Sequence, residues 1–150
     1  MNIKEYIKEQ RLITDGAMGT YYEEKYSEDT VIAEKENLKN PEQIKEIHLE
    51  YLRAGARLIR TNTFAANTMF LADMQEVKET VRAGYEIAKE AAASFQAENG
   101  KEIPVFIGAD LGPIYDLDHQ DYDNVLKEYK EICDTFLSCG ADCFVFETQS

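Results

Sequence analysis

Short apolar segments alternate with longer amphipathic ones along this chain, and each apolar segment gives way to glycine or polar residues at its end. We predict these apolar segments to be four strands, at residues 11–15, 58–61, 103–108 and 143–146. Strands that alternate with helices pair in parallel through right-handed crossovers, so the pattern predicts an α/β fold with a parallel sheet. The third segment carries no charge, which is typical of a strand covered on both faces.

The segments between the predicted strands have the apolar spacing of helices. Asn40-Pro41 is a helix start, with asparagine at the cap and proline in the first turn, and Gly55 ends that helix. The other predicted elements are a short polar helix at 2–10, a tyrosine-rich surface loop at about 20–40, and longer helices at 73–98 and 122–139.

Two helix-to-strand joints in the chain have similar sequences. Residues Gly55 to Thr63 align with residues Gly140 to Thr148. In both, a glycine stops a helix, a short strand follows, and a polar residue with threonine stands at the end of the strand. The similarity indicates a repeating β/α unit.

Charge and composition exclude several classes of protein. The chain has 150 residues with 16 Lys+Arg and 29 Asp+Glu, a formal net charge of −13, which argues against binding to nucleic acid or an anionic membrane. Hydrophobic residues make up 44%, enough for a folded core. No apolar stretch approaches the roughly 18 residues of a membrane span, and the charged first residues are not a signal peptide.

The cysteines indicate where the protein resides. Cys133, Cys139 and Cys143 are odd in number and cannot all pair within the chain, so we expect free thiols in a reducing compartment and a cytoplasmic location. Their spacing is not that of paired zinc ligands, so we expect small, buried apolar residues and no metal site in this chain.

Asp15 and Glu147 are the sharpest candidate site residues. Each directly follows a predicted buried strand, and in parallel α/β proteins the site lies at the carboxyl ends of the strands. Two carboxylates at one rim would attract a cationic group such as a substrate ammonium. The alternative is that each caps a helix or pairs with Arg60 or another cation.

The turn Gly16-Ala17-Met18-Gly19 offers backbone amides to an anion, because glycine leaves the approach open. It lacks the motifs of a phosphate loop, so a carboxylate is the better ligand, and an ordinary tight turn is the alternative. His48 lies on an apolar helix face and is expected to be a hydrogen-bonded packing residue. His119 lies in an acidic loop. The acidic runs Glu23-Glu24 and Glu34 to Glu36 are expected to be solvated surface.

Several motifs, in order, resemble the homocysteine S-methyltransferase family, which includes the homocysteine domain of methionine synthase. Each motif is short, and together they cover nearly the whole chain. They are Asp15 to Thr20, Asn37 before Pro41, His48 to Tyr51 leading into Ala54-Gly55-Ala56, Thr61 to Phe64 with Ala66-Asn67, Gly108 to Pro113, and Phe146 to Thr148.

The resemblance implies a TIM (β/α)₈ barrel, of which this chain would be the N-terminal half, with four parallel strands and crossover helices. It also implies that Asp15 and Glu147 hold the amino group of homocysteine and that the amides of Ala17 and Met18 receive its carboxylate. Asn62 and Thr63 would line the floor of the pocket. No catalytic residue is expected within this half.

The resemblance also implies chemistry that this half does not supply. The family holds zinc with cysteines on later strands, and the zinc-bound thiolate attacks an activated methyl group to give methionine. The donor is a methylcobalamin or folate-linked system, a sulfonium or a betaine, so cobalamin or folate would belong to other domains. Arg57, Arg60 and Asp110 depart from the residues expected in the family.

Two other readings stay open. The chain could belong to another barrel enzyme of the lyase or aldolase type, although no lysine stands at a strand end. It could also be a non-catalytic half-barrel that pairs with a partner. An isolated half-barrel has open strand edges, so we expect the missing C-terminal half as a partner, or else self-association or marginal stability.

Overall fold

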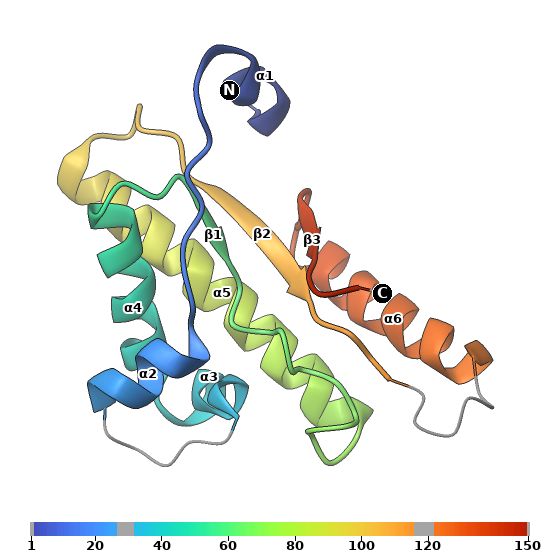
Figure 1. Cartoon of the computed structure of the whole chain (residues 1–150). Helices are drawn as coiled ribbons and strands as arrows, with labels where there is room; N and C mark the ends of the chain where they lie inside the picture. The colour runs from blue at the N-terminus through green and yellow to red at the C-terminus, as the bar shows by residue number, and fades with distance from the viewer. Residues whose placement is uncertain (1, 27–31, 116–121, 150) are drawn as a thin grey trace.

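A computed structural model describes residues 2–26, 32–115 and 122–149 of the chain. Figure 1 shows a small parallel sheet with long helices packed along it. The strands are β1 (Leu58–Arg60), β2 (Phe106–Leu111) and β3 (Phe144–Phe146), paired in parallel in the order β1-β2-β3. The α/β class and the parallel sheet predicted from the sequence are therefore confirmed.

The first predicted strand is reduced to a single bridge. Thr14 pairs in parallel with Leu58, and the Asp15 amide donates to the Leu58 carbonyl at 3.0 Å, beside β1. The described residues therefore form three strands rather than the four that we predicted. Ladder pairing extends no further than this bridge, and Ile13, which precedes it, is 58% exposed.

The long helices start and stop where the sequence indicates. They are α4 (Pro41–Arg53), α5 (Met74–Asn99) and α6 (Tyr122–Ser138), and α1 (Ile3–Glu9) precedes them. Gly55 and Gly140 follow α4 and α6 with φ angles of 114° and 89°, a region that favours glycine, so the two similar joints also share their backbone conformation.

The predicted loop at 20–40 is wrong for its described part. It contains α2 (Gly19–Tyr26), a 3₁₀ turn η1 (Ala33–Lys35) and α3 (Glu36–Lys39), while residues 27–31 lie outside the described ranges. Tyr22 is fully buried with Ile44 and Ile47 of α4, so one tyrosine anchors α2 although most of the helix is polar. The side chain of Asn40 does not cap α4 but donates to Glu36 at 2.6 Å.

Helices cover one face of the sheet and leave the other to the site. Ile59 packs against α4 and α5, while Ala109 and Leu111 pack against α5 and α6. Because side chains alternate along a strand, Arg60 and Asp110 lie on the opposite face. A side chain at Gly108 would meet Val145 at 2.7 Å and Arg60 at 3.7 Å, which places these two on that same face.

No helix within the described ranges is long and apolar enough to cross a membrane.

Candidate functional site

A cavity of about 470 Å³ lies at the carboxyl ends of the strands. The segments that follow Thr14, β1 and β3 contribute to its wall, and β2 contributes Asp110. The structure brings together on this wall all of the predicted site residues, which are Asp15, Ala17, Met18, Asn62, Thr63 and Glu147.

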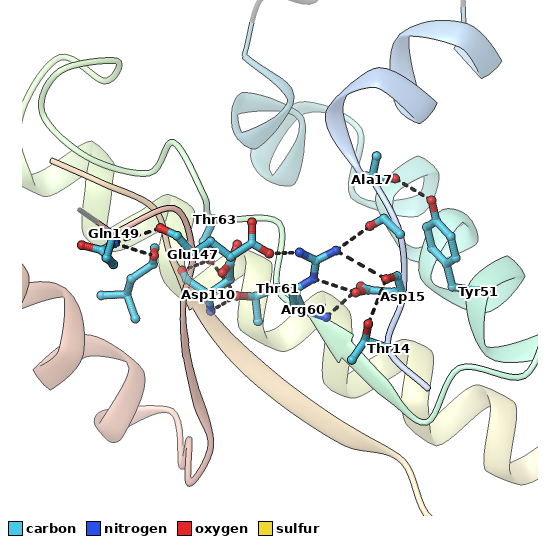
Figure 2. A network of polar contacts seen from close by, with 12 residues as sticks. Thr14, Asp15, Ala17, Tyr51, Arg60, Thr61, Thr63, Asp110, Glu147 and Gln149 are labelled. Carbon is cyan, nitrogen blue, oxygen red and sulfur yellow. Dashed lines mark hydrogen bonds and ion pairs between the residues drawn. The ribbon is translucent and has the colours of Figure 1, made fainter. Parts of the chain in front are cut away.

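Arg60 lies between the two predicted carboxylates (Figure 2). Its Nε donates to Asp15 Oδ1 at 2.8 Å, and its backbone amide donates to Asp15 Oδ2 at 2.8 Å. Its Nη1 forms an ion pair with Glu147 Oε1, and its Nη2 donates to the Gly16 carbonyl at 2.9 Å. Both carboxylates thus converge at one rim as predicted. Both also form an ion pair with Arg60, which was the alternative interpretation of these residues.

These groups differ in their access to the cavity. The side chain of Asp15 is 3% exposed, whereas those of Arg60 and Glu147 are 26% and 23% exposed. Burial raises the pKa of Asp15 above its ordinary value, and the hydrogen bonds and charge of Arg60 offset part of that rise. With both carboxyl groups ionised, the three side chains together carry one net negative charge.

The glycine turn leads directly into α2. The amides of Ala17 and Met18 precede the first turn of this helix and donate no hydrogen bond within the described part of the chain. The N-terminus of a helix carries partial positive charge that favours an anion. Gly16 permits a close approach, since a side chain there would meet the Tyr51 hydroxyl at 2.8 Å, and that hydroxyl donates to the Ala17 carbonyl at 2.7 Å.

Asn62 and Thr63 reach the cavity with their side-chain hydrogen-bond donors already engaged. Asn62 Nδ2 donates to the Ala33 carbonyl at 2.9 Å and to Asn37 Oδ1 at 2.8 Å. Thr63 Oγ1 donates to the Asp110 carbonyl at 2.7 Å and lies 2.6 Å from Thr61 Oγ1. These side chains hold the end of β1 in place and shape the cavity floor.

Two further buried carboxyl groups on the wall were not identified as site residues from the sequence. Glu34 is 7% exposed and accepts from the Ala65 amide at 2.8 Å, and burial raises its pKa. Asp110 is 4% exposed, and burial raises its pKa to about 7. The predicted third strand ends at residue 108, whereas β2 continues to Leu111 and includes Asp110. Because side chains alternate along a strand, the side chain of Asp110 lies on the same face of the sheet as Arg60.

The predicted solvated surface at Glu34 to Glu36 is therefore wrong. Glu36 is 4% exposed and accepts from Tyr22 Oη at 3.3 Å as well as from Asn40. Both glutamates are buried by the short helical segments that replaced the predicted loop.

The predicted packing role of His48 is confirmed in part. The residue is fully buried, but neither ring nitrogen has a hydrogen-bond partner within the described residues, and burial lowers its pKa to about 4. His119 lies outside the described residues.

The cysteines do not fit the zinc site that the resemblance implies. All three thiols are free and half-buried, two on or just after α6 and one just before β3. Burial raises the pKa of Cys133 and of Cys143, which disfavours the thiolate that zinc requires. The described residues contain no group of three histidine, cysteine, aspartate or glutamate side chains placed to hold a metal ion.

Fold and site together define an α/β protein with a charged cavity at the carboxyl edge of a parallel sheet. The chain belongs to the homocysteine S-methyltransferase family, whose model matches residues 12–150.

Curated relatives and solved structures agree with this assignment. The chain is 28% identical to the homocysteine S-methyltransferase of Escherichia coli (strain K12), over 94% of this chain and 51% of that protein. It is 28% identical to the methionine synthase of Mycobacterium leprae (strain TN), over 98% of this chain and 13% of that protein. The chain thus spans about half the length of the first relative.

Crystal structures of the homocysteine methyltransferase MmuM from Escherichia coli are similar to this fold. The oxidized form has a TM-score of 0.80 at 25% identity, and the metallated form has 0.77 at 26%. Each comparison covers 95% of this chain and 55% of the other.

Proposed function

We propose that this chain is the homocysteine-binding half of a homocysteine S-methyltransferase, and that it binds the amino-acid head group while methyl transfer takes place on the thiol. The observation that carries the proposal is the convergence of Asp15, Glu147 and the free amides of Ala17 and Met18 on one cavity of a chain that belongs to this family. We also propose that its sheet is the first part of a TIM (β/α)₈ barrel and that residues 1–150 are one partial barrel domain.

The cavity suits a zwitterion. The amides of Ala17 and Met18, with the N-terminus of α2 behind them, would receive the carboxylate of homocysteine. The net negative charge of Asp15, Arg60 and Glu147 would attract its ammonium group. Asn62 and Thr63 support this arrangement from the floor without offering a free side-chain hydrogen-bond donor.

Methyl transfer needs groups that the described residues do not provide. A thiol becomes a strong nucleophile as its thiolate, and zinc can hold a thiolate at neutral pH. Because the cysteines present do not fit such a site, the zinc of the proposed enzyme would take its ligands from other residues. Cobalamin or folate would belong to further domains, and the free thiols agree with a cytoplasmic enzyme.

The second half of the barrel is the proposed partner. Phe146 of β3 is 55% exposed, and Ile13 beside β1 is 58% exposed, so both edges of the sheet present apolar side chains. A chain that supplies the remaining strands would cover them. Without it, light scattering should detect self-association, or calorimetry a low melting temperature, and a stable monomer would contradict this expectation.

Calorimetric titration of the chain with L-homocysteine tests the proposed function. We expect saturable binding that weakens at least tenfold in Asp15→Asn, because the substitution removes the net negative charge that Asp15, Arg60 and Glu147 carry together. N-acetyl-homocysteine lacks the ammonium group and serves as the control ligand, which should bind weakly. Equal binding of the two ligands, or no binding of homocysteine, would overturn the proposal.

A further inference from the structure

Asp110 is held at the end of β2 by its backbone. Its amide donates to Thr61 Oγ1 at 3.0 Å, and its carbonyl accepts from Thr63 Oγ1 at 2.7 Å. These two hydrogen bonds fix the position of Asp110 against the end of β1. Its carboxyl group lines the same cavity as Asp15 and Glu147 (Figure 2).

The carboxyl group of Asp110 has no ion-pair partner among the described residues, whereas Asp15 and Glu147 both pair with Arg60. Its Oδ1 is buried without a hydrogen-bond partner among the described residues, although the residue is only 4% exposed. A buried polar atom without a partner is costly and is rare in folded proteins. The orphan oxygen therefore points to a ligand.

Arg60 already forms ion pairs with both neighbouring carboxylates. It engages both oxygens of Asp15 and pairs with Oε1 of Glu147. An ammonium group that enters the cavity would have to displace Arg60 from these partners or find another carboxylate. Asp110 is that other carboxylate.

We propose that Asp110 receives the ammonium group of the amino-acid ligand and loses its own proton as the ligand binds. The inference rests on the proposed function, which it refines by naming a contact residue for the ammonium group. The step is balanced, because the carboxylic acid becomes a carboxylate that faces the ammonium, and the proton leaves to the buffer.

The charges around Asp110 support a proton in the free protein. Burial is the main cause that raises its pKa to about 7, Asp15 and Glu34 raise it further, and Arg60 lowers it. Glu147 faces the same cavity from the end of β3. A cation bound at Asp110 lowers that pKa, so binding releases a proton below pH 7. Affinity should then rise about tenfold from pH 6 to pH 8.

Calorimetry with L-methionine as the probe tests this proton release. Methionine keeps the head group of homocysteine and has no thiol to titrate. Titrations at pH 6.5 in two buffers of different ionisation enthalpy count the protons, and we expect release of about 0.8 proton per ligand. Asp110→Asn should abolish the release and make the affinity independent of pH between 6 and 8. Asp110→Ser provides a second variant should the amide disturb the fold.

Two controls isolate Asp110. Glu34→Gln removes another buried carboxyl group whose pKa burial raises, and most of the proton release should persist, because burial is the main cause that raises the pKa of Asp110. The ligand 4-(methylthio)butanoate lacks the ammonium group and should release no proton.

The outcomes separate the inference from the proposed function. Methionine binding without proton release, or unchanged release in Asp110→Asn, overturns the role of Asp110 and leaves the proposed function standing. Loss of release in Glu34→Gln assigns the proton to Glu34 and also overturns the inference. If neither methionine nor homocysteine binds the unmodified chain, the proposed function fails, and the role of Asp110 fails with it.

Discussion

Asn37 and Asn62 are joined by two hydrogen bonds, one from Asn37 Nδ2 to the Asn62 carbonyl and one from Asn62 Nδ2 to Asn37 Oδ1, each 2.8 Å long. Asn37 Nδ2 also donates to the Thr80 carbonyl of α5 at 3.1 Å. One buried amide side chain thus connects α3, the end of β1 and α5 beneath the cavity floor.

Replacing Asn37 by alanine should therefore destabilise the chain. The change removes three buried hydrogen bonds, to the Asn62 carbonyl, to the Thr80 carbonyl and from Asn62 Nδ2, and we expect a loss of about 3 kcal/mol in the free energy of unfolding. Urea denaturation measures this loss. Asn99→Ala is the matched control, because Asn99 is exposed and bonds only the Phe95 carbonyl of its own helix, and it should change stability by less than about 0.5 kcal/mol.

Arg60→Leu should destabilise the chain in a pH-dependent way. Removing the guanidinium leaves Asp15 and Glu147 facing each other without a cation, and the loss at pH 7 should be about 3 kcal/mol. The loss should shrink below pH 5, where carboxyl groups take up protons.

Arg53→Ala provides the comparison for Arg60. Arg53 forms ion pairs with Glu46 and Glu98 through side chains that are all at least 43% exposed. Such pairs contribute little, so the variant should lose less than about 1 kcal/mol. Equal losses in the two variants would show that Arg60 is another surface cation.

Asp110→Asn should stabilise the chain at alkaline pH. A carboxyl group whose pKa is raised on folding contributes stability below its unfolded pKa, and this contribution is lost as the pH rises through the folded pKa. For Asp110 the unfolded pKa is 3.8 and the folded pKa is about 7. The asparagine variant does not ionise, so at pH 8 it should be more stable by up to about 4 kcal/mol. Denaturation at pH 5 and pH 8 measures the difference, which should be larger at pH 8.

His48 should make the chain sensitive to acid. Its pKa is lowered by burial from 6.5 to about 4, so the neutral ring contributes stability above pH 6.5 that is lost as pH falls to 4. The loss from this group should reach about 3 kcal/mol. Over this pH range, the slope of the unfolding free energy against pH should be smaller in His48→Leu than in the unmodified chain. The difference should correspond to at most one proton. An unchanged slope would mean that the ring finds a partner when it is charged.

The sequence predicts the long helices well because each combines a start signal, an apolar face and a stop. Pro41 begins α4, and Asp73 caps α5 by accepting from the Glu76 amide at 2.9 Å. The short helices α2 and α3 have no such pattern. Their positions depend on burying Tyr22 and Asn37 against distant parts of the chain, and propensity within one segment does not reveal that burial.

The site was predictable in position but not in its connections. Asp15 and Glu147 follow strands, and parallel pairing brings strand ends together, so their meeting follows from the order of elements. Which oxygen of each meets Arg60 depends on strand register, and Asp110 reaches the cavity only because β2 extends past residue 108. Register comes from the packing of the whole sheet, so residues counted along one segment do not give it.

Arg60, in the middle third of the sequence, therefore pairs with one carboxylate from residue 15 and with another from residue 147. The cavity is complete only after the segment at Asp15 and the segment at Glu147 have both packed against the end of β1, whatever the order in which the helices form. Loss of either segment would remove one carboxylate and with it the net negative charge beside Arg60, so the capacity to bind an amino acid should disappear, and ligand binding reports whether both segments are in place.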